Sequence, residues 1–434
     1  MIQRRPYLTL FSVFSCWKLL LAAIALVTPS PAYDTSTSLA LLPDSSSSSI
    51  GVSLVGALCN RLTRWDAIYF TKAAQRGYMN EQEWAFGWGY TQAIAATRRG
   101  MAGELTPPYP EIISAILLSN ACHFASVVVL YKLTLLSSNS RRAKKTAWLA
   151  SAFHILSPAG LFLSAPYSES LFSFLSFTGS YLYQWSSVAT RSGQHLSGNA
   201  VTLCSAIVFS VACTVRSNGL LNGLIFLLDF TSEVNNLTKE LTLRRLIRVF
   251  ILGVGGLVLG AGVVLPQYIA WKEYCTEGSL RPWCTKLVPS IYSYVQDFYW
   301  NVGLFRYWTL SNLPLFLLAA PTIFVLLESG VWGIQQRELI TDVNTEMVSR
   351  LAIAQLLLTG MALVGYHVQI ITRMSSGCAV WYWWVAAITM DEAVSKYGAS
   401  SRSGGMPGSA WVLRWMVMYG LIQGVLYAGF LPPA

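Results

Sequence analysis

A chain of 434 residues could form about two or three soluble domains, but 54% of its residues are hydrophobic, 12% are charged and its mean hydropathy is +0.47. This composition excludes an ordinary soluble enzyme and indicates a protein surrounded mainly by lipid. The formal net charge of +10 is spread over short basic clusters between hydrophobic runs, which is typical of topology signals and anionic-lipid contacts and unlike the continuous patch of a nucleic-acid-binding protein.

Apolar runs long enough to cross a bilayer as helices recur along the whole chain. We therefore expect an all-α polytopic membrane protein that consists of one membrane-embedded domain, residues 1–434. About eleven spans are expected from length and hydropathy. They lie near residues 11–28, 112–136, 146–164, 170–188, 199–215, 219–230, 249–270, 313–333, 351–370, 378–392 and 411–430.

Basic clusters beside the spans set the predicted topology, because positively charged flanks stay in the cytoplasm. They place the two long connections, 29–111 and 271–312, together on the opposite face. The serine-rich stretch 29–49 is predicted to be flexible. Two points stay open: the run that contains Lys18 is either a retained helix or a cleaved signal peptide, and 199–230 is either a helical hairpin or one span with a re-entrant piece.

The first connection contains an unusual polar and aromatic stretch, Arg61–Tyr90, which reads RLTRWDAIYFTKAAQRGYMNEQEWAFGWGY. A carboxylate in aromatic surroundings can act as a general base toward a hydroxyl group, so Asp66 is the candidate catalytic residue. Its neighbours Arg64 and Trp65 are candidates for substrate binding. The structural alternative is that Asp66 only pairs with Arg64 or Lys72, or caps a helix.

A helix start is predicted in the segment APYSESLFSFLSF, where Pro166 suits the first turn and Glu169 suits the positive end of the helix. Helix capping alone explains these residues adequately. The functional alternative is that Tyr167, Ser168 and Glu169 form hydrogen bonds with a polyhydroxyl substrate at the membrane surface.

Aromatic residues are dense in SIYSYVQDFYWNVGLFRYW, in the second long connection. An aromatic belt at the membrane interface is the plain explanation. Aromatic rings also stack on sugar faces, so Trp300 is a candidate for substrate binding, and Gln296, Asp297 and Asn301 are candidates for binding hydroxyl groups.

Two arginines lie next to small residues between apolar runs, Arg373 in QIITRMSSG and Arg216 in RSNGLLNG. The planar guanidinium group matches a pair of phosphate oxygens, and small neighbours allow close approach. Both arginines, with Asn218, are therefore candidates for binding a phosphate-bearing substrate, although positive anchoring of a helix end is the alternative for Arg373. The sequence contains neither a P-loop nor a dinucleotide fingerprint, so the expected phosphate is lipid-borne.

The eight cysteines show no CxxC motif and no metal-ligand spacing with the histidines. Cys275 and Cys284 lie close together in a polar segment and could form a disulfide bond or remain two unpaired thiols. No cofactor is expected, and whether a divalent metal ion takes part stays open.

Five blocks in the same order, spread over about Asn60 to Trp384, together resemble the PIG-V class of GPI mannosyltransferases. They are RWDAIYFTKAAQRGYMNEQEWAF, APYSESLFSFLSF, RSNGLLNG, YWNVGLFRYW and QIITRMSSG. The chain departs from the family pattern at Phe86–Tyr90, where relatives tend to have a phenylalanine and a proline-rich turn.

This resemblance implies a GT-C type glycosyltransferase of the endoplasmic reticulum membrane with a lumenal active site. It implies α1,6 transfer of the second mannose from dolichyl-phosphate mannose to the mono-mannosylated GPI lipid precursor, with inversion at the anomeric carbon. The family's Trp-Asp pair falls on Trp65 and Asp66, which makes Asp66 the expected base. The roles of Glu169 and Arg373 are our own inference. A small accessory membrane subunit is a further partner that the resemblance suggests.

Two other function classes remain as alternatives at this stage. In a lipid or small-solute transporter or scramblase, the charged residues would line a conduction path. In a noncatalytic subunit of a GPI-assembly complex, the fold would remain without the chemistry. The concentration of polar residues near the ends of spans on one face favours an enzyme.

Overall fold

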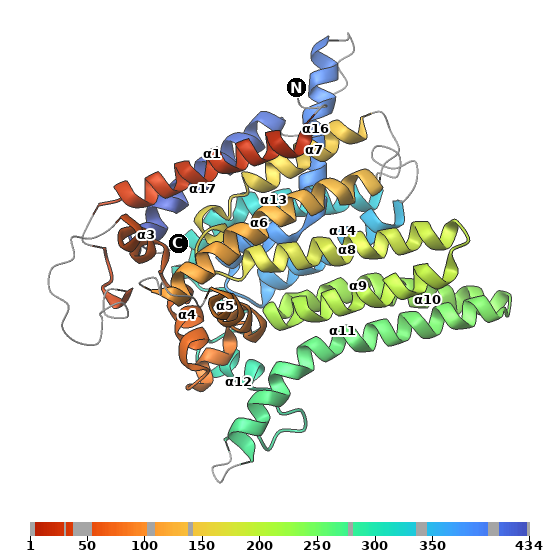
Figure 1. Cartoon of the computed structure of the whole chain (residues 1–434), viewed down its shortest axis with the longest axis horizontal. Helices are drawn as coiled ribbons and strands as arrows, with labels where there is room; N and C mark the ends of the chain where they lie inside the picture. The colour runs from red at the N-terminus through yellow and green to blue at the C-terminus, as the bar shows by residue number, and fades with distance from the viewer. Residues whose placement is uncertain are drawn as a thin grey trace.

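The computed structural model describes residues 5–29, 32–37, 54–101, 109–137, 142–276, 281–335, 345–397 and 408–431. Every regular element in these ranges is helical, as the sequence predicts. Most of the long helices run roughly side by side, whereas α16 rises steeply across their direction (Figure 1). They are α1 (Pro6–Val27), α6 (Pro110–Leu136), α7 (Ala143–Ile155), α8 (Glu169–Arg191), α9 (His195–Val215), α10 (Gly223–Lys239), α11 (Leu243–Cys275), α13 (Leu313–Gln335), α14 (Thr345–Val364), α16 (Ala379–Tyr397) and α17 (Ser409–Ala428).

Six helices in the described ranges are long and apolar enough to span a membrane: α1, α6, α9, α11, α14 and the segment Leu310–Gln335 that contains α13. This confirms a polytopic membrane protein but does not confirm eleven spans. Each predicted span does coincide with helical structure. The others are too short or not apolar enough: α16 is apolar only over Ala379–Met390, and the run predicted at 146–164 ends as α7 at Ile155 and continues through a turn into the 3₁₀ segment η2 (Gly160–Leu163).

The open question about 199–230 is answered by a helical hairpin. Helix α9 ends at Val215, Arg216 is extended, and the 3₁₀ segment η3 (Ser217–Asn222) leads into α10. Helix α9 thus ends where the polar sequence RSNG begins. The break therefore places Arg216 at the end of a long helix.

Four short helices gather at one end of the bundle: α3 (Leu54–Leu62), α4 (Asp66–Arg76), α5 (Trp88–Gly100) and α12 (Ile291–Phe298). They lie on the left in Figure 1, whereas the α10–α11 connection lies at the opposite end. The two long connections therefore meet on one face of the bundle. Most of the stretch 29–49 lies outside the described residues.

The N-terminal helix α1 is integrated into this fold. The Lys18 ammonium donates to the carbonyl oxygen of Leu163 at 2.9 Å and to Oγ of Ser164 at 2.7 Å, so α1 holds the turn after η2. Helix α11 packs so tightly on α9 that a Cβ at Gly262 would lie 2.0 Å from the carbonyl oxygen of Ser210. At the end of α11, Cys275 forms a disulfide bond with Cys284, with their Cα atoms 5.7 Å apart.

Candidate active site

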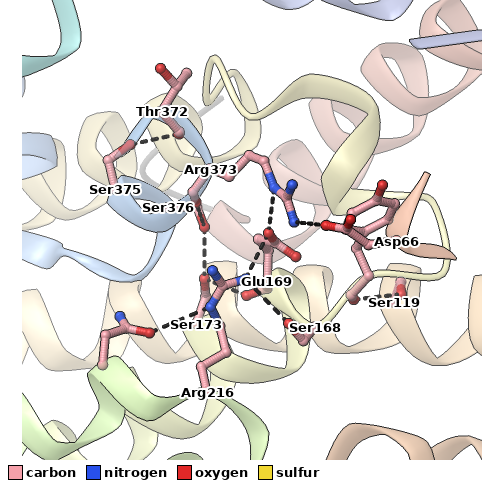
Figure 2. Close-up of polar contacts among 12 residues, drawn as sticks. Asp66, Ser119, Ser168, Glu169, Ser173, Arg216, Thr372, Arg373, Ser375 and Ser376 are labelled. Atoms are coloured by element: carbon pink, nitrogen blue, oxygen red, sulfur yellow. Dashed lines mark hydrogen bonds and ion pairs between the residues drawn. The ribbon is translucent and has the colours of Figure 1, made fainter. Parts of the chain in front are cut away.

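Four charged side chains that are far apart in the sequence meet at the end of the bundle that carries α3 to α5 (Figure 2). Arg373 donates through Nη2 to Oδ2 of Asp66 at 3.0 Å and through Nε to Oε1 of Glu169 at 2.8 Å. Arg216 approaches Glu169 from the other side, with Nη1 2.7 Å from Oε1. The formal charges of two carboxylates and two guanidinium groups cancel within this cluster.

A sharp turn between α3 and α4 presents Asp66. Trp65 adopts the left-handed region of backbone conformation, with φ of +52°, and Asp66 is the first residue of α4. The Asp66 side chain remains 31% exposed, and its ion-pair partner is Arg373, at 3.0 Å. The predicted alternatives, pairing with Arg64 or Lys72, do not appear among the ion pairs of the described residues.

Arg64 points away from the Asp66 cluster and has a structural role. Its guanidinium group donates to the carbonyl oxygen of Ala428 at 3.3 Å and to Oδ1 of Asn60 at 2.9 Å, and it lies over the ring of Phe430. Burial lowers the pKa of Arg64 to about 10. The expectation that Arg64 binds substrate therefore has no support in its placement, because this side chain ties α3 to the end of α17.

Glu169 is the buried centre of the cluster. It is the first residue of α8, and its side chain is 1% exposed. Oε1 accepts a hydrogen bond from Arg373 and forms an ion pair with Arg216, whereas Oε2 has no hydrogen-bond partner in the described part of the chain. Arg216 also donates to Oγ of Ser168 at 3.2 Å. The sequence motif APYSES thus supplies an anion that holds two cations at fixed positions.

Two aromatic rings hold the guanidinium group of Arg373. Its Cζ atom lies 4.4 Å from the ring centroid of Phe162 and 4.7 Å from that of Tyr167. The Tyr167 hydroxyl donates to the carbonyl oxygen of Arg64 at 3.0 Å, which links α8 to the turn before Asp66. Stacking and two hydrogen bonds together restrict the arginine to one orientation.

The cluster borders a cavity of about 760 Å³, large enough for a sugar and part of a lipid. Most of the predicted site residues line it: Trp65, Asp66, Tyr167, Ser168, Arg216, Asn218, Gln296, Trp300 and Arg373. Arg64, Glu169 and Asn301 are not among the lining residues; Glu169 lies behind the two arginines and Asn301 is exposed to the outside. The two long connections thus contribute to a single cavity.

Comparison with known proteins now identifies the family. The family described as "Mannosyltransferase (PIG-V)" matches residues 5–434, nearly the whole chain. The chain belongs to this family. A protein named GPI mannosyltransferase 2 from Gibberella zeae is 41% identical over 100% of this chain and 99% of its own length. Proteins of the same name from Aspergillus oryzae and Yarrowia lipolytica are 38% and 35% identical, and each match covers 99% of this chain.

Solved structures give a more distant likeness. The oligosaccharyltransferase of Archaeoglobus fulgidus in its apo form matches 99% of this chain and 56% of its own with a TM-score of 0.47 and 11% sequence identity. Membership in the mannosyltransferase family rests on the sequence matches, and the membrane-embedded helical fold rests on the structure itself.

In this mannosyltransferase, two glycines of the stretch Phe86–Tyr90 allow a close contact between helices. A Cβ at Gly87 would lie 1.8 Å from the carbonyl oxygen of Val215, and one at Gly89 would lie 2.1 Å from Oγ1 of Thr214. Glycine at both positions lets α5 touch the last turn of α9. This contact supports the backbone immediately before Arg216.

The segment that follows α4 is held by a buried carboxylate outside the cavity. Glu83, in the 3₁₀ segment η1 (Glu81–Ala85), pairs with Arg76 at 2.6 Å and accepts from the backbone N–H of Met79 at 2.9 Å. Burial by itself would raise the pKa of Glu83, but Arg76, the Met79 N–H and Asn80 together lower it below its usual value. Glu83 therefore stabilises the connection as an anion.

Some cavity residues were not predicted from the sequence. Phe162 lies within an ordinary apolar run, and His367 follows the apolar run of α14. His367 contacts the carbonyl oxygen of Trp300 through Nε2 at 3.1 Å and stacks on Tyr307. Only three-dimensional proximity to the charged cluster distinguishes these residues from core positions.

Proposed function

We propose that this mannosyltransferase transfers the second mannose, in α1,6 linkage, from dolichyl-phosphate mannose to the mono-mannosylated GPI lipid precursor. The relatives named GPI mannosyltransferase 2 support the GPI substrate. The observation that carries the reaction chemistry is the partly exposed carboxylate of Asp66, which lines the cavity within 3.0 Å of Arg373. One base and one anion-binding group are what a single displacement at an anomeric carbon requires.

In this mechanism the 6-hydroxyl of the acceptor mannose attacks the anomeric carbon of the donor while Asp66 removes the hydroxyl proton. The bond between the anomeric carbon and the phosphate oxygen breaks, and its electron pair remains on dolichyl phosphate. A β-linked donor gives an α-linked product, so configuration inverts in one step. Asp66 can carry out this task because Oδ2 is fixed by Arg373 and the carboxylate faces the cavity.

Arg373 and Arg216 would stabilise the departing phosphate. Before substrate binds, their charges are balanced by Asp66 and Glu169. A bound phosphate competes with the carboxylates for guanidinium donors. Donor binding would thus loosen the contact between Arg373 and Asp66 and free the carboxylate to accept the hydroxyl proton. The buried Glu169 keeps both arginines in place during the reaction.

The cavity face would lie toward the lumen of the endoplasmic reticulum. The predicted topology supports this orientation, since it places both long connections opposite the basic clusters. Dolichyl-phosphate mannose and the acceptor would enter from the membrane, and the lipid-linked donor is a substrate, so the proposal requires no cofactor. A small accessory membrane subunit remains a proposed partner from the family resemblance.

The test is to supply cells depleted of this protein with wild type, Asp66→Asn or Asp297→Asn, matched for abundance. Asp297 is a suitable control because its side chain is 54% exposed and pairs with Arg306. We expect the one-mannose GPI intermediate to accumulate unless wild type or Asp297→Asn is present. Rescue by Asp66→Asn would remove Asp66 as the base, and accumulation of a different intermediate would contradict the assigned step.

A further inference from the structure

Gln423 of α17 presents an unpaired amide to the cavity. The residue is 5% exposed and lines the same cavity as Asp66 and Arg373. Neither its Nε2 nor its Oε1 has a hydrogen-bond partner among the described residues. Buried amides in folded proteins are nearly always hydrogen-bonded, since leaving both groups unpaired is costly. A buried, unpaired amide on a cavity wall indicates a missing polar ligand.

The surrounding backbone is shaped to accommodate this amide. Gly160 has φ of +50°, and a Cβ there would lie 2.8 Å from Oε1 of Gln423 and 3.1 Å from the carbonyl oxygen of Gly420. Two residues further along the same turn, the ring of Phe162 supports Arg373 at 4.4 Å. One short turn thus contacts both the Gln423 amide and the charged cluster. This arrangement places the amide beside the reaction centre.

The chemistry of the wall around Gln423 fits a sugar. An amide offers donors and an acceptor, so it can bind two hydroxyl groups at once, whereas it has no charge with which to attract a phosphate. Trp65 presents a second buried and unpaired group, the indole N–H, to the same cavity. Phe162 and Tyr419 add aromatic rings to the lining. The phosphate-binding arginines and this uncharged wall are therefore chemically different parts of one cavity.

We propose that Gln423 binds hydroxyl groups of a hexose held beside Asp66 and so contributes to sugar specificity. The inference rests on the proposed function for the identity of the hexose as mannose. Two sugars meet at the reaction centre, the mannose of the donor and the terminal mannose of the acceptor. Both offer neighbouring hydroxyl groups, and the experiment distinguishes between them.

The test measures transfer by the purified full-length chain with two series of substrates, donors and acceptors in which single mannose hydroxyl groups, other than the reacting 6-hydroxyl of the acceptor, are replaced by hydrogen. Wild type is expected to lose about tenfold in kcat/KM when a hydroxyl group bound by Gln423 is removed. Gln423→Met, which has a similar shape and no amide, should show the same loss with the parent substrate and little further loss with that deoxy substrate. A response in the donor series assigns the donor sugar, and a response in the acceptor series assigns the acceptor sugar.

Gln355→Met is the matched control. Gln355 is also a buried glutamine, 2% exposed, but its amide donates to Leu326 and Ser329 and it does not line this cavity. It should leave the pattern across the deoxy substrates unchanged. If no deoxy substrate loses activity with wild type, or if Gln423→Met responds to the series as wild type does, the inference is wrong. Absence of any transfer by wild type would instead contradict the proposed function.

Discussion

Arg373 bridges Asp66 and Glu169 through two different nitrogens of one planar group. A lysine at this position has one nitrogen and cannot hold both carboxylates while stacking between two rings. Arg373→Lys is therefore expected to lower kcat by about a hundredfold or more, in line with the loss of one electrostatic stabiliser of a transition state. The measurement is mannosyl transfer by membranes that contain equal amounts of each variant.

Arg306→Lys serves as the control for this substitution, because Arg306 pairs with Asp297 on an exposed surface where both side chains are about half exposed. Such pairs contribute little to stability or function. Equal losses for the two variants would argue against a specific role of Arg373.

Glu83 gives the connection between α4 and α5 a defined dependence on pH. Its folded-state pKa is lowered by Arg76 and backbone N–H groups, so its stabilising effect is present above the ordinary glutamate pKa and is lost as pH falls through the folded value. We expect wild type to have a higher Tm than Glu83→Gln at pH 7, and this difference should shrink below about pH 4.3. Thermal unfolding in detergent across this pH range measures it.

Glu240→Gln is the comparison for the pH experiment, since the Glu240 side chain is 67% exposed beside Arg245. It should change Tm little. A constant difference in Tm between wild type and Glu83→Gln from pH 7 to pH 3.5 would show that the Glu83 charge is unimportant.

The sequence identifies some site residues much better than others. Asp66 is recognisable because an acid in a short polar stretch between apolar runs is unusual. Its partner Arg373 is 307 positions away, so local patterns predict that both matter but not that they pair. Arg64 follows the same polar pattern but lies outside the cavity, because the turn at Trp65 directs adjacent side chains to different sides. Gln423 gave no signal within an apolar helix.

At the scale of elements, the contact between α5 and the end of α9 is the joint that supports Arg216. A Cβ at Gly87 would lie 1.8 Å from backbone that cannot yield easily, the carbonyl group of Val215. Gly87→Ala is therefore expected to push α5 away and displace Arg216, with a loss of activity of at least about tenfold or poor accumulation. Activity and protein abundance are measured together.

Gly100→Ala, at the other end of α5, is the matched control. A Cβ at Gly100 would meet no atom within 4 Å, and alanine favours a helix. This variant should accumulate and act like wild type. Normal behaviour of Gly87→Ala would show that the α5–α9 contact does not position the site.

At the scale of the whole molecule, the orientation of the protein in the membrane can be tested by N-glycosylation. The sequence contains a sequon at Asn236, in α10 near the α10–α11 connection and so at the end of the bundle opposite the cavity. With the cavity face in the lumen, Asn236 should remain unmodified. A sequon introduced at 285–287 by Thr285→Asn with Leu287→Thr should instead be glycosylated, because Leu287 is fully exposed on the cavity face. Glycosylation at either sequon is measured as a shift in gel mobility that glycosidase treatment removes. A glycan at Asn236 would contradict the proposed orientation.

The fold class could be predicted because helical hydrophobic runs dominate the chain, but the number of spans could not. Runs such as 146–164 contain enough apolar residues to suggest a crossing, yet the chain breaks at Leu156 and turns through Gly160 to place Phe162 beside Arg373. Irregular backbone inside a membrane protein is tolerated where it lines a cavity. The break in this run thus belongs to the site, and the predicted number of eleven spans is not confirmed.

The decisive measurement is transfer by the purified chain from dolichyl-phosphate mannose to a one-mannose GPI acceptor, comparing wild type with Asp66→Asn. If Asp66 is the base, we expect a two-mannose product with an α1,6 linkage from wild type, and a rate for Asp66→Asn lowered by about a hundredfold to ten-thousandfold, the range expected for loss of a general base. Two results would contradict a single displacement with Asp66 as the base. One is a rate for Asp66→Asn within about threefold of the wild-type rate, and the other is a product with retained configuration at the anomeric carbon.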